Sequence, residues 1–197
     1  GVERRSTEHI QIIPKTDKPG IDIHIAPDTP FESVHIPVML TESGLNDLVY
    51  NDFYIGEGAT AEIVAGCGIN NCGCDTTQHD GIHTFHVGKN AHVTYVEKHY
   101  GEGTGTGKRI LNPQTIVYLE EGASITLDTS QIRGVDDTKR LTKCIVGKDA
   151  ELVITEKLLT HGEQHAVSDM IVELNGDGSR ADVVSRSVAK DSSYQKF

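Results

Sequence analysis

Hydrophobic and polar positions alternate along most of this 197-residue chain. In the segment 91–96, Ala91, Val93 and Tyr95 fall on one side of an extended backbone and the intervening residues fall on the other. A period of two residues is the spacing of a β-strand. The same alternation is found in residues 21–25, 34–38, 125–127, 152–154 and 170–174. Helical spacing is not sustained anywhere, so the pattern predicts an all-β fold with little or no helix.

A turn motif recurs between these segments, as GEGATAEIV from Gly56 and GKNAHVTYV from Gly88, with weaker copies from residues 120, 147 and 176. The small residues that follow the turns align at Ala59, Ala91, Ala123, Ala150 and Ser179. Their intervals of 32, 32, 27 and 29 residues lie in the range of repeat architectures. Short strands, Gly-rich turns and a fixed period favour a β-solenoid over a sandwich or an up-and-down barrel.

The repeat predicts one domain over residues 1–197. Residues 1–32 contain four prolines and are predicted to wrap the first coil as irregular strand and turn. The last residues, SVAKDSSYQKF, stop within a strand pattern. Because an uncapped coil exposes an unpaired strand edge, we expect either a truncated chain or a subunit that pairs at that edge.

The composition narrows the function classes. A net charge of −11 opposes the phosphate backbone, which argues against a nucleic-acid partner. No run of about 18 apolar residues and no apolar leader are found, so neither a membrane span nor a signal peptide is predicted. We therefore expect a cytoplasmic protein, in which the four cysteines persist as thiols.

Three of the four cysteines, Cys67, Cys72 and Cys74, lie in the short segment GCGINNCGC. The spacing C-x4-C-x-C matches neither a zinc knuckle nor a ferredoxin. The intervening Gly and Asn residues permit tight turns through which the sulfurs could converge. The pattern leaves two interpretations open, an open metal or sulfur site and small buried core thiols. Cys144 shares a strand face with Val146 and is predicted to be core.

Histidines follow the cysteines at His79, His83 and His86. In a straight strand His86 lies on the face opposite His83, whereas His79 and His83 share a face about 13 Å apart at roughly 3.3 Å per residue. That separation is too long for one ion, so additional ligands would have to come from neighbouring coils. The alternative is that His83 is a buried histidine beside Phe85 and that His86 faces solvent.

Longer stretches of the chain resemble a known family. These stretches are LNDLVYNDFYIGEGATAEIVAGCGI, HTFHVGKNAHVTYVEKHYGEG, LEEGASITLDTSQIRG, LLTHGEQHAVSDMIV and SRSVAKDSSYQKF. Their order and spacing over residues 34–197 resemble the SufB/SufD scaffold proteins of iron–sulfur cluster assembly, notably the short archaeal and anaerobe-type members. The resemblance implies a right-handed parallel β-helix, in agreement with the solenoid predicted from the repeat.

The resemblance also implies a function. Members of this family are scaffolds rather than enzymes: they pair with the ATPase SufC, accept sulfur from a cysteine desulfurase system and hold a transient iron–sulfur cluster. They work as a homodimer or a SufB/SufD heterodimer. The helical segment that grips the ATPase would lie beyond Phe197, so the resemblance implies a missing C-terminal segment.

Single residues are carried over from the same resemblance. Cys67, in VAGCG, matches the cysteine thought to receive sulfur. Cys72 and Cys74 are expected to have a sulfur or iron role, and His79 and His83 are taken with them as candidate metal ligands.

Two other function classes are weighed against the scaffold. One is an enzyme on a β-solenoid, either a hexapeptide-type acyltransferase or a polysaccharide lyase. The run IGEGATAEIVAG mimics two hexapeptides, but the six-residue period is not kept in later repeats. The other is a structural zinc-binding protein.

Overall fold

The computed structural model describes residues 4–197 as fifteen β-strands joined by short turns. The strands are β1 (Ile10–Pro14), β2 (Gly20–Ile25), β3 (Glu32–Leu40), β4 (Asn46–Ile55), β5 (Thr60–Asn70), β6 (Thr77–Val87), β7 (His92–Glu102), β8 (Arg109–Leu111), β9 (Gln114–Leu119), β10 (Ser124–Arg133), β11 (Asp137–Val146), β12 (Glu151–Thr160), β13 (His165–Leu174), β14 (Arg180–Ala189) and β15 (Tyr194–Lys196). No helix is found in this range, and hence none that could cross a membrane.

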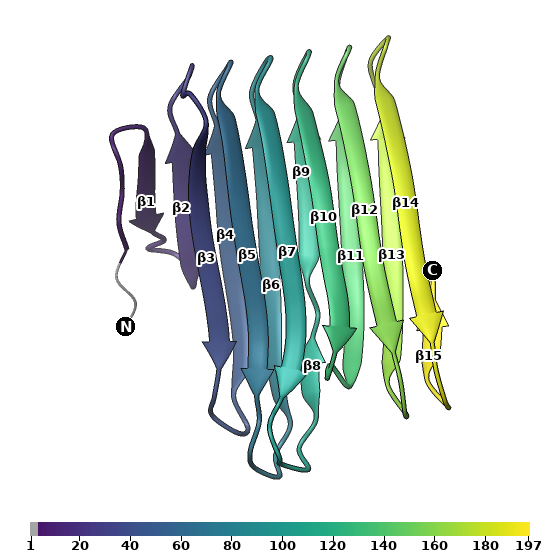
Figure 1. Ribbon diagram of the computed structural model, residues 1–197. Helices are drawn as coiled ribbons and strands as arrows, with labels where there is room; N and C mark the ends of the chain where they lie inside the picture. The colour runs from purple at the N-terminus through teal and green to yellow at the C-terminus, as the bar shows by residue number, and fades with distance from the viewer. Residues whose placement is uncertain (1–3) are drawn as a thin grey trace.

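The strands form two sheets that face each other across a common core (Figure 1). One sheet has the order β1-β2-β4-β6-β8-β11-β13-β15, with β9 also between β6 and β11; the other has the order β3-β5-β7-β10-β12-β14. Every adjacent pair is parallel except β1 and β2, which are antiparallel. The chain therefore alternates between the sheets and advances one coil at a time, which confirms the predicted parallel β-solenoid.

The small residues aligned by the sequence repeat stack at one corner of the coils. Ala59, Ala91, Ala123 and Ala150 are each no more than 1% exposed. The N–H of the residue after Ala91, Ala123 and Ala150 donates to the alanine carbonyl of the preceding coil, as in His92 to Ala59 at 2.8 Å. This arrangement confirms the corner predicted from the repeat.

One residue in each of these corner turns has a positive φ. These residues are Asp28, Gly58, Asn90, Gly122, Asp149 and Gly178. Aspartate or asparagine thus alternates with glycine from coil to coil. A Cβ on Gly122 would lie 2.3 Å from the Asn90 Oδ1, so the side chain of one coil occupies the space that the next glycine leaves.

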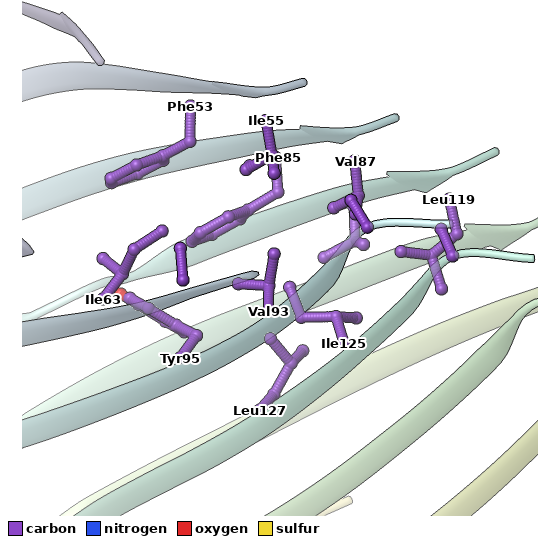
Figure 2. Packing of buried hydrophobic residues seen from close by; sticks show 14 of the residues in the cluster. Phe53, Ile55, Ile63, Phe85, Val87, Val93, Tyr95, Leu119, Ile125 and Leu127 are labelled. Carbon is purple, nitrogen blue, oxygen red and sulfur yellow. The ribbon is translucent and has the colours of Figure 1, made fainter. Parts of the chain in front are cut away.

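The apolar part of the core lies near this corner. Phe53 and Phe85 stack with ring centroids 4.5 Å apart, and Tyr95 from the opposite sheet packs on Phe85 at 4.8 Å (Figure 2). All three are fully buried. Burial of this kind contributes roughly 1.5–3 kcal/mol for each large side chain. Continuous ladders of side chains therefore hold the coils together.

The two ends of the solenoid differ. Within residues 1–32, predicted as an irregular wrap, the described part contains β1 and β2, and β2 already pairs in register with β4; residues 1–3 lie outside the described range. At the other end, Leu174 of β13 and Val183 of β14 are 52% and 44% exposed although they point to the lumen side. The lumen is thus open at β14.

Candidate functional site

Cys67 lies in β5 and points into the lumen of the solenoid, opposite the polar residues of β6. It is 3% exposed and pairs in register with His99 of β7. Burial raises the pKa of the Cys67 thiol well above its ordinary value, and the nearby charge of Glu97 raises it further. Cys144 is fully buried, and burial raises its pKa to about 12, which confirms its predicted place in the core.

Cys72 and Cys74 lie in the turn between β5 and β6, and both are exposed. The Cys72 thiol donates to the Asn70 Oδ1 at 3.4 Å. The structure therefore separates the three clustered thiols, because one faces the lumen and two face solvent. All four cysteines are free.

Neighbouring turns hold the Cys72–Cys74 turn in place. The Gly107 N–H donates to the Gly73 carbonyl at 3.1 Å, and the Asn71 side chain donates to the Asp75 carbonyl at 2.8 Å. A Cβ on Gly105 would lie 2.1 Å from the Gly73 oxygen, so the glycines of segment 101–107 allow this close stacking. The two exposed thiols are thus displayed on an ordered platform.

His79 and His83 both point into the lumen from β6, and each is 3% exposed. A Cβ on Gly81, between them, would lie 3.2 Å from the His79 Nε2 and 3.5 Å from the His83 Nε2. The two rings therefore lean toward each other over the glycine, although their backbone positions lie four residues apart. His86 points outward and stacks between Tyr54 and Tyr118, as expected for the opposite face.

The hydrogen bonds of His83 use both of its ring nitrogens. Its Nδ1 donates to the Tyr95 hydroxyl at 2.6 Å, that hydroxyl donates to Glu97 at 2.8 Å, and its Nε2 accepts from Asn51 at 3.3 Å. Burial lowers the pKa of His83 to about 4, so the ring is neutral at pH 7. His79 differs, because only its Nδ1 is bonded, to the Asp47 carboxylate at 2.8 Å.

A buried ion pair, which the sequence analysis did not identify, lies beside these histidines. Arg140 of β11 donates to the Glu97 Oε2 at 2.7 Å and to the His99 Nδ1 at 3.0 Å. Burial opposes the charge of Glu97, but the neighbouring His99 and Arg140 hold its pKa well below the usual range. The signal was present in the alternation, since Glu97 and His99 fall on the inward face of Val93 and Tyr95, whose strand had been predicted.

The polar network continues toward the open end of the lumen. The Arg140 Nε lies 3.6 Å from the Glu156 Oε1, and Glu156 accepts hydrogen bonds from Ser168 at 2.8 Å and Ser185 at 2.9 Å. Polar side chains from β6 to β14 therefore line one half of the solenoid interior, in contrast to the aromatic half.

The described residues 4–197 contain no group of three or more His, Cys, Asp or Glu side chains placed to hold a metal ion. The arrangement provides two separate chemical elements instead. Outside, Cys72 and Cys74 offer two accessible soft ligands or nucleophiles. Inside, Cys67, His79 and Gly81 border a packing gap that has no room for a water molecule, beside Glu97 and His99.

Comparison with known proteins identifies the family of this chain. The profile of the family described as "SUF system FeS cluster assembly, SufBD core domain" matches residues 48–197. An iron–sulfur cluster assembly SufBD family protein of Methanocaldococcus jannaschii is 25% identical over 164 residues, which cover 81% of this chain and 50% of that protein. An iron–sulfur cluster assembly SufBD family protein of Archaeoglobus fulgidus is 24% identical over 149 residues, 72% of this chain and 37% of that protein.

The chain thus spans about half the length of the first of these relatives and less of the second. No solved structure matches it. The family profile covers most of the solenoid, from within β4 to the last described residue. The chain belongs to the SufBD family, and its solenoid contains the core domain of this iron–sulfur cluster assembly family.

Proposed function

We propose that this chain is a scaffold subunit of the SUF system, which accepts sulfur and iron, holds a transient iron–sulfur cluster and works with an ATPase of the SufC type. The observation that carries the proposal is the match of residues 48–197 to the SufBD core domain. The ATP hydrolysis would belong to the partner, so the chain itself is not proposed as an enzyme. A cytosolic place and pairing with a second SufB- or SufD-type subunit are parts of the same proposal.

The exposure of the thiols supports a division of roles. Cys72 and Cys74 are accessible to a protein donor, and their ordered turn presents both sulfurs to solvent. We therefore assign them the first contact with the sulfur donor and with iron. Cys67 is assigned as a sulfur acceptor inside the lumen, where bulk water is excluded. The iron and sulfur are the cargo of this scaffold.

Anaerobic reconstitution tests the proposal. The full-length protein, together with its ATPase partner, would be incubated with a cysteine desulfurase, cysteine and ferrous iron, and thiolate-to-iron absorption would be followed. We expect the absorption to weaken strongly in the Cys72→Ser/Cys74→Ser variant. The matched control is Cys144→Ser, which removes a thiol that is fully buried in the apolar core. Equal absorption in wild type and the double variant would contradict the assignment of the exposed pair.

Sulfur transfer to individual cysteines gives a second readout. With radiolabelled cysteine as the sulfur source, we expect label on the protein that is lost upon reduction, as a persulfide would be. Mass spectrometry then assigns the labelled residue. Absence of label from every cysteine in the presence of an active desulfurase would refute the sulfur-accepting role.

A further inference from the structure

One buried nitrogen in the lumen lacks a hydrogen-bond partner. Among residues 4–197, the buried side-chain N and O atoms without a hydrogen-bond partner are the His79 Nε2 and the Thr115 Oγ1. His79 is 3% exposed, so bulk water does not reach this nitrogen. An unpaired buried polar atom costs roughly 1–3 kcal/mol. Such an atom calls for an explanation, and a catalytic role is one of the recognised ones.

The other nitrogen of His79 fixes the ring. Asp47 lies directly opposite His79 in the register of β4 and β6, and its carboxylate accepts a hydrogen bond from the Nδ1 at 2.8 Å. Because the Nδ1 carries the hydrogen, the Nε2 presents a lone pair. An imidazole that is oriented by a carboxylate and has a free nitrogen is the arrangement of a general base.

The free nitrogen lies over Gly81, and His79 and Cys67 border the same narrow gap in the packing. The glycine makes room for the ring, since a Cβ there would lie 3.2 Å from the His79 Nε2. The other lumenal histidines have no unbonded ring nitrogen that could accept a proton from Cys67. His83 is bonded at both nitrogens, and His99 accepts from Arg140 with its Nδ1 and lies 3.4 Å from Glu97 with its Nε2.

We infer that His79, positioned by Asp47, takes the proton of Cys67 when this thiol acts as a sulfur nucleophile. The inference rests on the proposed sulfur-accepting role of Cys67 and adds the residues that make it reactive. It also answers a chemical difficulty, because a buried thiol holds its proton firmly and only the thiolate attacks sulfur. The imidazolium formed on His79 would be paired with the Asp47 carboxylate.

The step balances with a hydropersulfide as co-reactant. The Cys67 thiolate attacks the outer sulfur of the donor R–S–SH, a new S–S bond forms on Cys67, and the donor S–S bond breaks. The bonding electrons leave with the donor as R–S⁻, which takes the proton back from His79. The sulfane sulfur keeps its oxidation state. The products are the Cys67 persulfide and the thiol R–SH.

Other charged groups around the gap set the background for this proton transfer. Glu97 faces Cys67 and His83 from β7, and Arg140 faces them from β11. Glu97 and Arg140 are paired with each other at 2.7 Å, but Arg140 also faces Glu156 at 3.6 Å, so the effect of Glu97 on Cys67 exceeds that of Arg140. Asp47 from β4 then remains as the carboxylate bonded directly to His79.

The reactivity of Cys67 toward methyl methanethiosulfonate tests the inference without any SUF partner. This small neutral reagent transfers a methylthio group to a thiolate and releases methanesulfinate. The full-length protein would carry Cys72→Ser, Cys74→Ser and Cys144→Ser, and modification of Cys67 would be timed by mass spectrometry from pH 6 to 9. We expect His79→Gln to slow the reaction about 10²-fold near neutral pH.

The pH profile separates proton transfer from a merely structural effect. Without the base, the rate should rise in proportion to hydroxide, whereas the parent protein should show a plateau. Asp47→Asn, which leaves the ring in place, should give a smaller loss in the same direction and keeps the test decisive should His79→Gln fail to fold. His83→Gln, at the same gap but bonded at both nitrogens in the parent, is the matched control and should retain the plateau.

Three results would overturn the inference. The first is an equal rate and an equal pH profile in the parent protein and in His79→Gln. The second is reaction of Cys67 only at the independently measured rate of global unfolding. The third is stoichiometric protection of Cys67 by Zn²⁺ that requires His79, which would make the pair a metal site. Failure of the proposed function would look different from failure of this inference. In that case no sulfur would be transferred from the desulfurase, but the reactivity of Cys67 and its dependence on His79 would be unchanged.

Discussion

The buried ion pair of the lumen gives the sharpest test of how this solenoid is held together. Arg140 is 5% exposed and lies between the carboxylates of Glu97, at 2.7 Å, and Glu156, at 3.6 Å. Arg140→Met keeps an unbranched side chain of similar length but leaves both carboxylates without their cation. Removal of one partner from a buried pair costs about 3–5 kcal/mol. We expect this loss in the free energy of unfolding, measured by urea denaturation with far-UV circular dichroism at pH 7.

A second substitution tests the cause of that loss. Glu97→Gln in the Arg140→Met background removes one stranded charge and keeps a side chain that can accept the hydrogen bond from Tyr95. We expect the double variant to recover about half of the lost stability. A loss below about 1 kcal/mol in the single variant, or a further loss in the double variant, would refute the reasoning.

The pH dependence of the same variant has a definite sign. In the wild type the folded-state pKa of Glu97 lies well below its ordinary value of 4.5, so its contribution is present above pH 4.5 and is lost as the pH falls through the folded-state pKa. In Arg140→Met, the guanidinium no longer opposes burial, so the folded-state pKa of Glu97 is higher than in the wild type. Protonation of Glu97 then removes a stranded charge from the folded state of the variant. The stability gap between the two proteins should therefore narrow as the pH falls from 7 toward 4.5.

Three further measurements test other parts of the structure. Titration of the native protein with the bulky reagent DTNB should detect Cys72 and Cys74 rapidly and the two buried thiols only after denaturation; four fast thiols would contradict the separation of the cluster. Gly105→Ala places a Cβ 2.1 Å from a backbone oxygen and should lower the melting temperature and increase proteolysis of the adjacent turn, whereas Gly66→Ala, which meets nothing within 4 Å, should do neither. Burial lowers the pKa of His83 from 6.5 to about 4, so the unfolded state takes up this proton at a higher pH than the folded state does. The free energy of unfolding should therefore fall by about 1.4 kcal/mol per pH unit as the pH is lowered from 6.5 to about 4. An equally steep slope in a His83→Gln variant would show that another group causes the effect.

The fold could be predicted from the chain because two independent periods agree. The alternation of Val93 and Tyr95 fixes which side of the strand is buried, and the interval between Ala59 and Ala91 fixes how far the chain travels per coil. A solenoid repeats the same local solution, so neither observation needs knowledge of distant contacts. The alternation in residues 21–25 already indicated β2, whereas β1 is not visible in the proline-rich pattern.

The site was less predictable, for a physical reason. The residues that cluster in sequence, Cys67 and Cys72, are separated by the change from strand to turn, which sends one thiol inward and the other outward. The residues that meet in space come from different coils, as do Asp47 and His79 in one pair and Glu97 and Arg140 in the other. Strand geometry correctly placed His79 and His83 on one face. The backbone separation of about 13 Å overestimates the distance between the two rings, because both imidazoles lean over Gly81. Contacts across coils need the register, and the sequence pattern alone does not supply it.

The alternation of Asp or Asn with Gly at the corner turns makes a pair of coils, rather than a single coil, the smallest unit that can be copied without a steric conflict. Duplicating the coil that contains Asn90 alone would place two branched side chains next to each other where one normally overhangs a bare α-carbon. Lengthening or shortening this protein by design should therefore proceed in steps of two coils. Gene duplications that change the length of such a chain would face the same parity rule.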